Sequence, residues 1–158
     1  MMQAITSDEI YSFLKESNKI ENVFDVRNDE VAVASGLLVA PSLGLKSLEL
    51  YVNVTAKAPL RERHGMNVRV GAHVAPVGGA GIPAALVNIL HRAAESDDTP
   101  YKVHHRYESL HPFMDGNGRS GRLLWLWMHL RAETYMGLGF LHQWYYESLS
   151  AGRRGGGE

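Results

Sequence analysis

The chain has 158 residues, of which 45% are apolar, and its formal net charge at pH 7 is -1. This size and apolar content fit one compact domain with a buried core. Because 16 basic residues nearly balance 17 acidic ones, no general field favours nucleic acid or an anionic membrane, and any anion site must be local. The absence of cysteine excludes disulfide frameworks and thiolate metal sites.

The N-terminus lacks the features of a secretory signal. Its first residues, MMQAITSDEIYSFLKES, place acidic side chains where a signal peptide has its apolar core. No apolar run in the sequence approaches the length that spans a bilayer. We therefore expect a cytoplasmic protein with no membrane or nucleic-acid partner.

The first third of the chain has helical patterns. Thr6 and Glu9 have the spacing of a capping box, and apolar residues follow at helical intervals. Asp29 is a candidate cap for a second helix, which Pro41 ends. Helices are therefore predicted at residues 6–20, 29–39 and 42–55.

A glycine-punctuated segment follows between residues 65 and 81. Val68 and Val70 alternate with polar residues and so lie on one face of a strand, and the pattern is interrupted at Gly71 and Ala72. This predicts a short β-hairpin. Because two strands alone are only marginally stable, the hairpin is predicted to be a projecting flap and not a core sheet.

The second half of the chain is again helical. Pro83 has the position of a first-turn proline, and Thr99 with Pro100 starts a helix that leads directly into His111. Helices are predicted at residues 83–95, 100–110, 117–131 and 140–149.

The expected architecture is an all-α bundle with a small β-hairpin flap. Residues 1–28 are predicted to form an N-terminal helix and linker packed on the same domain, and residues 29–150 its core. The last eight residues, AGRRGGGE, are glycine-rich, so residues 151–158 are predicted to be a disordered tail.

Residues 111–122, HPFMDGNGRSGR, concentrate polar groups and glycines in twelve positions. Pro112 restricts His111 to an extended conformation, so the preceding helix must end there, with the imidazole at a helix-to-loop junction. A neutral imidazole accepts the proton of a hydroxyl near physiological pH. His111 is therefore a candidate general base.

The rest of this stretch indicates an anion site. Gly116 and Gly118 permit unusual backbone conformations, and the next helix begins in this turn, so free N–H groups can converge on an anion. Arg119 and Arg122 are three residues apart on that helix, hence on one face, and both suit phosphate oxygens. Asp115 is unfavourable beside phosphates unless a cation intervenes, and one carboxylate with substrate oxygens is a usual Mg²⁺ environment. Together, these residues and His111 indicate the transfer of a group from a Mg-nucleoside triphosphate to a hydroxyl.

Each of these features also has an ordinary structural explanation. A histidine before a proline is commonly a structural residue, and a DG or NG pair is commonly a turn. Two arginines at helical spacing commonly lie on a solvated face. Their joint occurrence in twelve residues favours the chemistry. A metal site of His104, His105 and His111 is an alternative, disfavoured because the two adjacent histidines point in different directions on a helix.

The stretch resembles the signature of Fic domains, H-P-F-x-D/E-G-N-G-R-x-x-R, and meets every specified position. The segments HHRYESL, LLWLW and GMNVRVGAHVAP extend the resemblance over most of residues 40–150. The resemblance implies an all-helical domain with a hairpin lid, which transfers AMP from ATP to a protein hydroxyl and releases pyrophosphate. It implies that His111 is the general base and Asp115 the Mg²⁺ ligand.

The same resemblance implies a nucleotide site and a docking site. The nucleotide-binding residues would be Gly116, Asn117, Gly118, Arg119, Gly121 and Arg122. The flap residues Val70, Gly71, Ala72, His73 and Val74 would clamp the backbone of the target by strand addition. The partner implied is a protein with a serine, threonine or tyrosine hydroxyl, with self-modification and a homo-oligomer left open.

The segment SNKIEN, Ser17 to Asn22, resembles the inhibitory motif S/T-x-x-x-E-G/N of one class of the family. This resemblance implies that Glu21 is a brake, because a carboxylate on Arg122 would occupy the guanidinium needed for the γ-phosphate. The pattern is loose and also fits an ordinary helix C-terminus. Two other functions stay open: removal of AMP with Glu21 orienting a water, and a nucleotide- or partner-binding module without turnover.

Overall fold

A computed structural model of the chain describes residues 2–156, with side chains through residue 153. Its elements, in chain order, are α1 (Ser7–Ile20), α2 (Asn28–Leu38), α3 (Leu45–Thr55), β1 (Arg69–Val70), β2 (His73–Val74), α4 (Gly81–Glu95), α5 (Pro100–Leu110), α6 (Asn117–Ala132) and α7 (Phe140–Gly156). The predicted all-α fold with a two-stranded hairpin is confirmed for this part of the chain. None of the helices described is both long and apolar enough to cross a bilayer.

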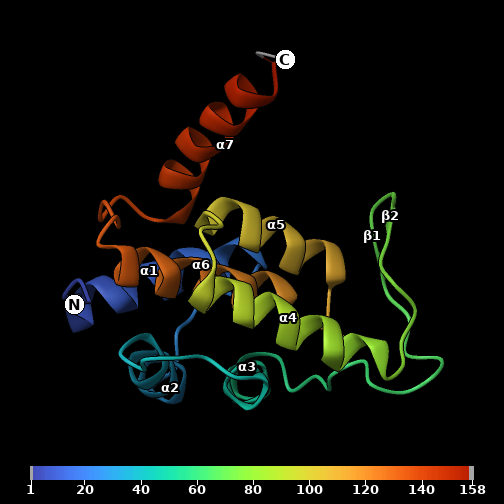
Figure 1. The fold of residues 1–158 in the computed structure, drawn as a ribbon. Helices are drawn as coiled ribbons and strands as arrows, with labels where there is room; N and C mark the ends of the chain where they lie inside the picture. The colour runs from blue at the N-terminus through green and yellow to red at the C-terminus, as the bar shows by residue number, and fades with distance from the viewer. Residues whose placement is uncertain (1, 157–158) are drawn as a thin grey trace.

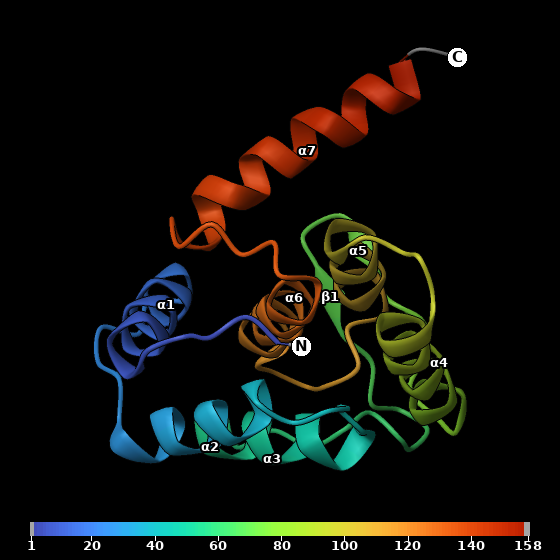
Figure 2. The ribbon, with the colours of Figure 1, turned by 60° about the vertical axis from the view of Figure 1, so that its left-hand side comes forward.

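Helix α6 is the centre of the bundle. Every residue from Leu123 to Leu130 is buried, which is the pattern of a helix surrounded by other elements. Helices α1, α2, α3 and α5 pack against it, and Figure 2 shows this ring around α6. Its two buried tryptophans have partners for their indole N–H groups: Trp125 donates to Glu147 and Trp127 to the carbonyl of Ala40, both at 2.9 Å.

The start of α1 agrees with the sequence prediction, and the start of α2 differs from it. Thr6 caps α1, where its hydroxyl accepts from the Glu9 amide at 3.1 Å and completes the predicted capping box. Asp29 is not the cap of α2, because the helix begins at Asn28 after Arg27. Asp29 instead lies in the first turn, where a carboxylate is favoured by the exposed N–H groups of the helix.

Helix α7 is longer than the sequence predicts. The expected end at Leu149 and the disordered tail from residue 151 are wrong for residues 151–156, because α7 continues to Gly156. Extending an existing helix costs little, since each further residue adds a hydrogen bond. Residues 157 and 158 lie outside the described residues. Figures 1 and 2 show α7 leaving the body of the bundle after its first turns, which contact α1 and α5.

The segment before the flap holds the loop that follows α5. The Arg61 amide donates to the Pro112 carbonyl at 2.9 Å, and the Met114 amide donates to the Pro59 carbonyl at 3.0 Å. Leu60 and Phe113 form an antiparallel bridge between these bonds. The loop containing Pro112 is therefore held on one side by a strand-like pairing.

The side chain of Arg61 extends this connection to the flap. Its guanidinium is fully buried and donates to four main-chain carbonyls, those of Leu110, His111, Met66 and Pro76, at 2.6–3.0 Å. Two of these carbonyls belong to the end of α5, and the other two flank the hairpin. One cation thus ties the base of the flap to the residues that precede the loop.

Replacing Arg61 is expected to destabilise the fold strongly. In Arg61→Met four buried carbonyls lose their donor, and we expect the free energy of unfolding in urea to fall by about 3 kcal/mol or more. Arg63→Met, at an exposed position of the same segment, is the control and should change it by less than about 0.5 kcal/mol. Equal effects of the two substitutions would contradict a structural role for the Arg61 guanidinium.

Candidate active site

The loop after α5, the start of α6, the end of α1 and the flap surround one cavity of about 380 Å³. Its lining residues are Glu21, Val68, Arg69, Val70, Glu108, His111, Met114, Asp115, Gly116, Asn117, Gly118 and Arg122. Most of the residues that the sequence singles out in the 111–122 stretch therefore face a common space.

His111 ends α5 in a left-handed conformation. Its φ is 52° and its ψ 62°, so the predicted extended conformation is wrong, although the helix does end before His111 as predicted. Pro112 excludes the right-handed helical conformation at the preceding residue. The left-handed alternative lets the His111 amide reach the Tyr107 carbonyl at 2.9 Å, while the His111 carbonyl accepts from Arg61. The left-handed turn therefore keeps both main-chain groups bonded.

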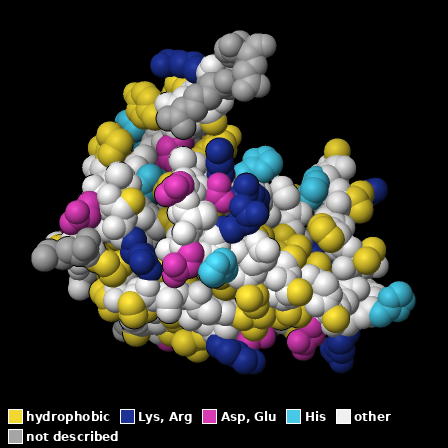
Figure 3. Space-filling model, viewed as in Figure 1, with side chains coloured by type: hydrophobic (Ala, Val, Ile, Leu, Met, Phe, Trp, Pro, Cys, Tyr) yellow, Lys and Arg dark blue, Asp and Glu magenta, His cyan; other side chains and the backbone are white. Residues whose placement is uncertain are grey.

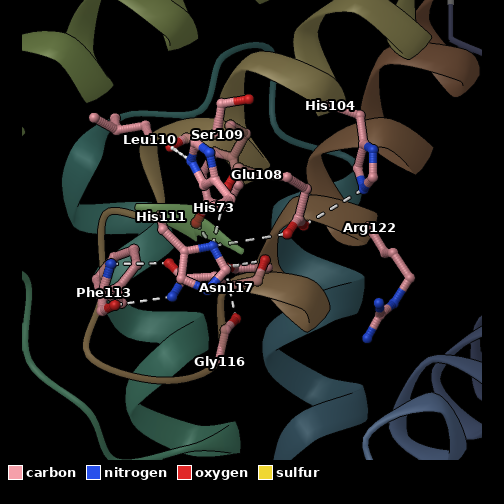
Figure 4. A network of polar contacts seen from close by, with 12 residues as sticks. His73, His104, Glu108, Ser109, Leu110, His111, Phe113, Gly116, Asn117 and Arg122 are labelled. Carbon is pink, nitrogen blue, oxygen red and sulfur yellow. Dashed lines mark hydrogen bonds and ion pairs between the residues drawn. The ribbon is translucent and has the colours of Figure 1, made fainter. Parts of the chain in front are cut away.

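The imidazole of His111 has a defined tautomer. Its Nδ1 lies 3.0 Å from the main-chain carbonyl of Glu108, which can only accept, so Nδ1 carries the hydrogen in the neutral ring (Figure 4). This leaves the lone pair on Nε2. Burial lowers the pKa of His111, partly offset by its bond to the Glu108 carbonyl. The ring is therefore mainly neutral at pH 7 and able to accept a proton at Nε2.

The loop between His111 and α6 is closed by Asn117. Its amide oxygen accepts from the Phe113 N–H and its amide nitrogen donates to the Phe113 carbonyl, both at 2.8 Å. The side chain thus fastens the loop, so any anion contact of Asn117 must come from its main-chain N–H. Gly116 has φ 80°, and a Cβ there would meet Ala56 at 2.9 Å. The turn requires glycine on both counts.

Arg122 is bound by the end of α1. Its Nη2 donates to Glu21 Oε1 at 2.7 Å and to the Ser17 carbonyl at 3.0 Å, and its Nε donates to Ser17 Oγ at 2.7 Å. Arg122 is 6% exposed. Glu21, which the sequence pairs with Arg122, is therefore in contact with it, and so is Ser17 of the same segment.

Asn22 has a backbone role in this arrangement. It follows Glu21 with φ 60°, a left-handed conformation that asparagine and glycine adopt most readily. Its amide donates to the Lys19 carbonyl at 3.0 Å. Asn22 is not part of the cavity lining, and it ends the helix so that Glu21 remains next to Arg122.

Two predicted nucleotide-binding residues lie elsewhere. Arg119 donates to the Thr55 carbonyl of α3 at 3.1 Å, and Gly121 packs on Tyr107 and Glu108 of α5. Neither belongs to the cavity lining. Arg119 and Arg122 are three residues apart on α6, but their long side chains reach different neighbours, the Thr55 carbonyl and the end of α1.

The flap projects from the helical bundle (Figure 1), and Arg69 and Val70 of its first strand line the cavity. Gly71 and Ala72 form its turn, with Val70 paired to His73, as the sequence predicts. The Nε2 of His73 donates to the Ser109 carbonyl at 2.9 Å, which connects the flap to α5. In Figure 3 the flap is the projection on the right, where apolar side chains are visible, and Val70 and Val74 are both exposed.

Sequence reasoning missed Glu108, which also lines the cavity. Its carboxylate lies 3.5 Å from His104 Nε2 and 4.0 Å from His111 Nδ1 (Figure 4). Burial raises the pKa of Glu108 to about 7, an effect that Arg122 opposes. Burial also lowers the pKa of His104 to about 4. The only sequence signal was the i, i+3 spacing of Glu108 from His111.

The donors for a metal are sparse. Asp115 borders the cavity, and its Oδ1 accepts from the Gly116 amide at 2.7 Å. Within residues 2–156 no group of three or more histidine, aspartate or glutamate side chains is arranged to hold a metal ion, so a site of His104, His105 and His111 is not formed. A single carboxylate fits a Mg²⁺ ion that takes its other ligands from phosphates and water.

A comparison with known protein families matches the part of the chain that forms this site. Residues 67–129 match the model of the Fic/DOC family. No curated protein matches the chain. The matched stretch contains the flap, α4, α5, the loop with His111 and most of α6. Helix α1, which carries Ser17 and Glu21, lies outside it.

The raised pKa of Glu108 predicts a pH dependence of stability. Its carboxyl binds a proton more tightly in the folded chain, with a pKa of about 7 against an ordinary value of 4.5. Its contribution to stability is therefore fully present below pH 4.5 and is lost as the pH rises through 7. Glu108→Gln removes this loss, so we expect the variant to gain roughly 2 kcal/mol in unfolding free energy relative to wild type between pH 5 and pH 8.

Urea titrations at several pH values measure this difference. Glu62→Gln, which alters an exposed carboxylate, is the control. The prediction fails if Glu108→Gln and wild type lose stability in parallel over this range.

Proposed function

We propose that this protein is an adenylyltransferase that transfers AMP from ATP to a hydroxyl of a protein and is held inactive by Glu21. The observation that carries the proposal is that His111 and Arg122 of the 111–122 stretch face one cavity, where Arg122 is bound by Glu21. The family match adds support, since members of the Fic/DOC family commonly carry out AMP transfer or a related transfer.

In this proposal His111 is the general base. Its Nδ1–H is fixed by the Glu108 carbonyl, so Nε2 accepts the proton of the target hydroxyl. The deprotonated oxygen attacks the α-phosphorus, and pyrophosphate leaves. The lowered pKa of His111 keeps the ring in its proton-accepting form at pH 7.

The start of α6 is the proposed phosphate site. The main-chain N–H groups of Asn117 and Gly118 lie in the first turn of the helix, where the helix dipole favours anions. Glycine at position 118 also leaves room for Glu21, because a Cβ there would lie 2.3 Å from Glu21 Oε1. Asp115 is the proposed holder of Mg²⁺, which when bound neutralises phosphate charge.

The proposed brake acts on Arg122. Three hydrogen bonds to Ser17 and Glu21 occupy its guanidinium. A terminal phosphate that needs the same donors must displace the carboxylate or bind in another position. Removing the carboxylate frees one Nη2 donor, while the bonds from Nη2 and Nε to Ser17 stay in place.

Removal of AMP from a modified target is the second candidate. The Glu21 side chain is 38% exposed and borders the cavity, so it is able to orient a water molecule there. This function would be lost in Glu21→Gly, whereas AMP transfer would increase. The two functions therefore respond in opposite directions to one substitution.

Labelling with ATP and Mg²⁺ tests the proposed activity. In cell lysate, or on the protein itself, we expect little AMP incorporation by wild type. We expect at least about tenfold more by Glu21→Gly, because the Nη2 donor that Glu21 occupies becomes available to phosphate. Glu21→Gly combined with His111→Ala should incorporate none, as measured by intact mass and radiolabel. Equal labelling by wild type and Glu21→Gly would remove the brake from the proposal.

Nucleotide affinity distinguishes the two arginines. In the Glu21→Gly protein, Arg122→Gln is expected to weaken ATP binding by about tenfold or more, because a charge-assisted bond to phosphate is lost. Arg119→Gln, whose side chain faces α3, is expected to change the Kd by less than about threefold. Calorimetry measures both, and a larger effect at Arg119 would contradict this assignment.

A further inference from the structure

The carboxyl group of Glu108 lies between two histidines of the same helix. Its Oε2 is 4.0 Å from His111 Nδ1, and its Oε1 is 3.5 Å from His104 Nε2. The main-chain carbonyl of Glu108 already accepts from His111 Nδ1. Figure 4 shows the backbone and the side chain of this one residue on the same side of the His111 ring.

The Glu108 carboxyl group lowers the stability of the fold at this position. Glu108 Oε1 and His104 Nε2 are both buried and have no hydrogen-bond partner among the described residues. Unsatisfied buried polar groups cost free energy, so an apolar side chain would suit the packing better. Room for the carboxylate exists because residue 121 is glycine: a Cβ there would lie 2.5 Å from Oε1. The placement therefore needs an explanation other than packing.

The neighbourhood of His111 supplies that explanation. A proton taken up at Nε2 converts the ring to an imidazolium, whose positive charge is shared by both ring nitrogens. Arg61 and His73 both disfavour this charge. The Glu108 carboxylate, at 4.0 Å, is the group that borders both the ring and the cavity on the side of α5.

We propose that Glu108 is a positioning residue for His111, whose ionised carboxylate stabilises the imidazolium formed when Nε2 removes the proton from the target hydroxyl. This inference rests on the proposed transfer reaction. In that step the O–H bond of the target breaks and an Nε2–H bond forms. The oxygen bonds to the α-phosphorus, and the bond to pyrophosphate breaks with its electron pair. Glu108 itself forms no bond.

Other charged groups surround the pair. Arg122 on α6 favours the ionised form of Glu108, and Glu21 on α1 disfavours it. For His111, Glu21 favours the charged ring, while Arg61 and His73 oppose it. His104, the other neighbour of Glu108, is kept neutral by burial.

Histidine NMR tests the pairing without any need for turnover. In the free protein with labelled histidine, and with the His111 signal assigned from His111→Ala, Glu108→Gln is expected to lower the titration midpoint of His111 by about one pH unit or more. Glu108→Val, which removes charge and shape together, should lower it similarly.

Glu147→Gln is the matched control. Glu147 Oε1 lies 3.1 Å from His129 Nε2 in another buried histidine–carboxylate contact, and it is not part of the cavity lining. This substitution should leave the His111 midpoint unchanged. An unchanged midpoint in Glu108→Gln, or an equal shift in Glu147→Gln, overturns the inference.

The rate of transfer gives the second readout. In the Glu21→Gly protein, the pH–rate profile under single-turnover conditions should rise with the deprotonation of His111. Adding Glu108→Gln should move this rise to lower pH and reduce the plateau about threefold to tenfold, since a weaker base removes the proton more slowly. A purely structural role would change the amount of folded protein and leave the position of the rise in place.

The two readouts separate the inference from the proposed function. A shifted His111 midpoint in a protein that transfers nothing supports the pairing and rejects the transferase. Transfer that is present, with neither the midpoint nor the pH profile changed by Glu108→Gln, supports the transferase and overturns the inference.

Discussion

The bonds of the Arg61 guanidinium are the constraint on which the site depends. A cation buried in a bundle costs several kcal/mol of desolvation unless its donors are satisfied, and here four carbonyls from two distant segments satisfy them. Burial accordingly lowers the pKa of Arg61. The carbonyls of Leu110 and His111 accept these bonds where α5 ends in the left-handed turn. Arg61, which is not part of the cavity lining, thus holds the main chain that carries the His111 ring.

The cavity in front of that turn has a nearly balanced set of charges. Arg69 and Arg122 are the cations of the wall, and Glu21, Glu108 and Asp115 are its acidic groups. Glu21 is bonded to the arginine, while burial keeps Glu108 partly protonated near neutral pH. Such a site binds an anion weakly until the carboxylate on Arg122 is moved. The electrostatic potential in the cavity therefore depends on the position of α1.

The sequence predicted the features that depend on neighbouring residues. The helices and the flap follow from local periodicity and turn residues, and the common location of His111, Asp115 and Arg122 follows from a short loop running into a helix. Asn22 is similar, since its left-handed φ explains why asparagine follows Glu21.

What the sequence did not predict depends on contacts between distant segments. Arg61 meets His111 across 50 residues, and no local pattern distinguishes it from the other arginines of its segment. The contact of Arg119 with Thr55 was not predicted, because helical spacing fixes the direction of a Cβ but not the neighbour that a long side chain reaches. Glu108 was missed because an i, i+3 pair at the end of a helix usually lies in solvent, and its burial arises from the packing of α5 on α6.

The bond between Glu21 and Arg122 joins residues 101 positions apart in one chain. Any anion in solution therefore competes with a tethered carboxylate, whose effective concentration is in the millimolar range even for flexible linkers. Helix α1 is packed on α2 and α6 and is not flexibly linked, so its local concentration at Arg122 is higher still. The strength of this competition is set by how firmly α1 is anchored, and substitutions in its apolar face, such as Phe13 or Leu14, would alter the anion affinity of a cavity they do not touch.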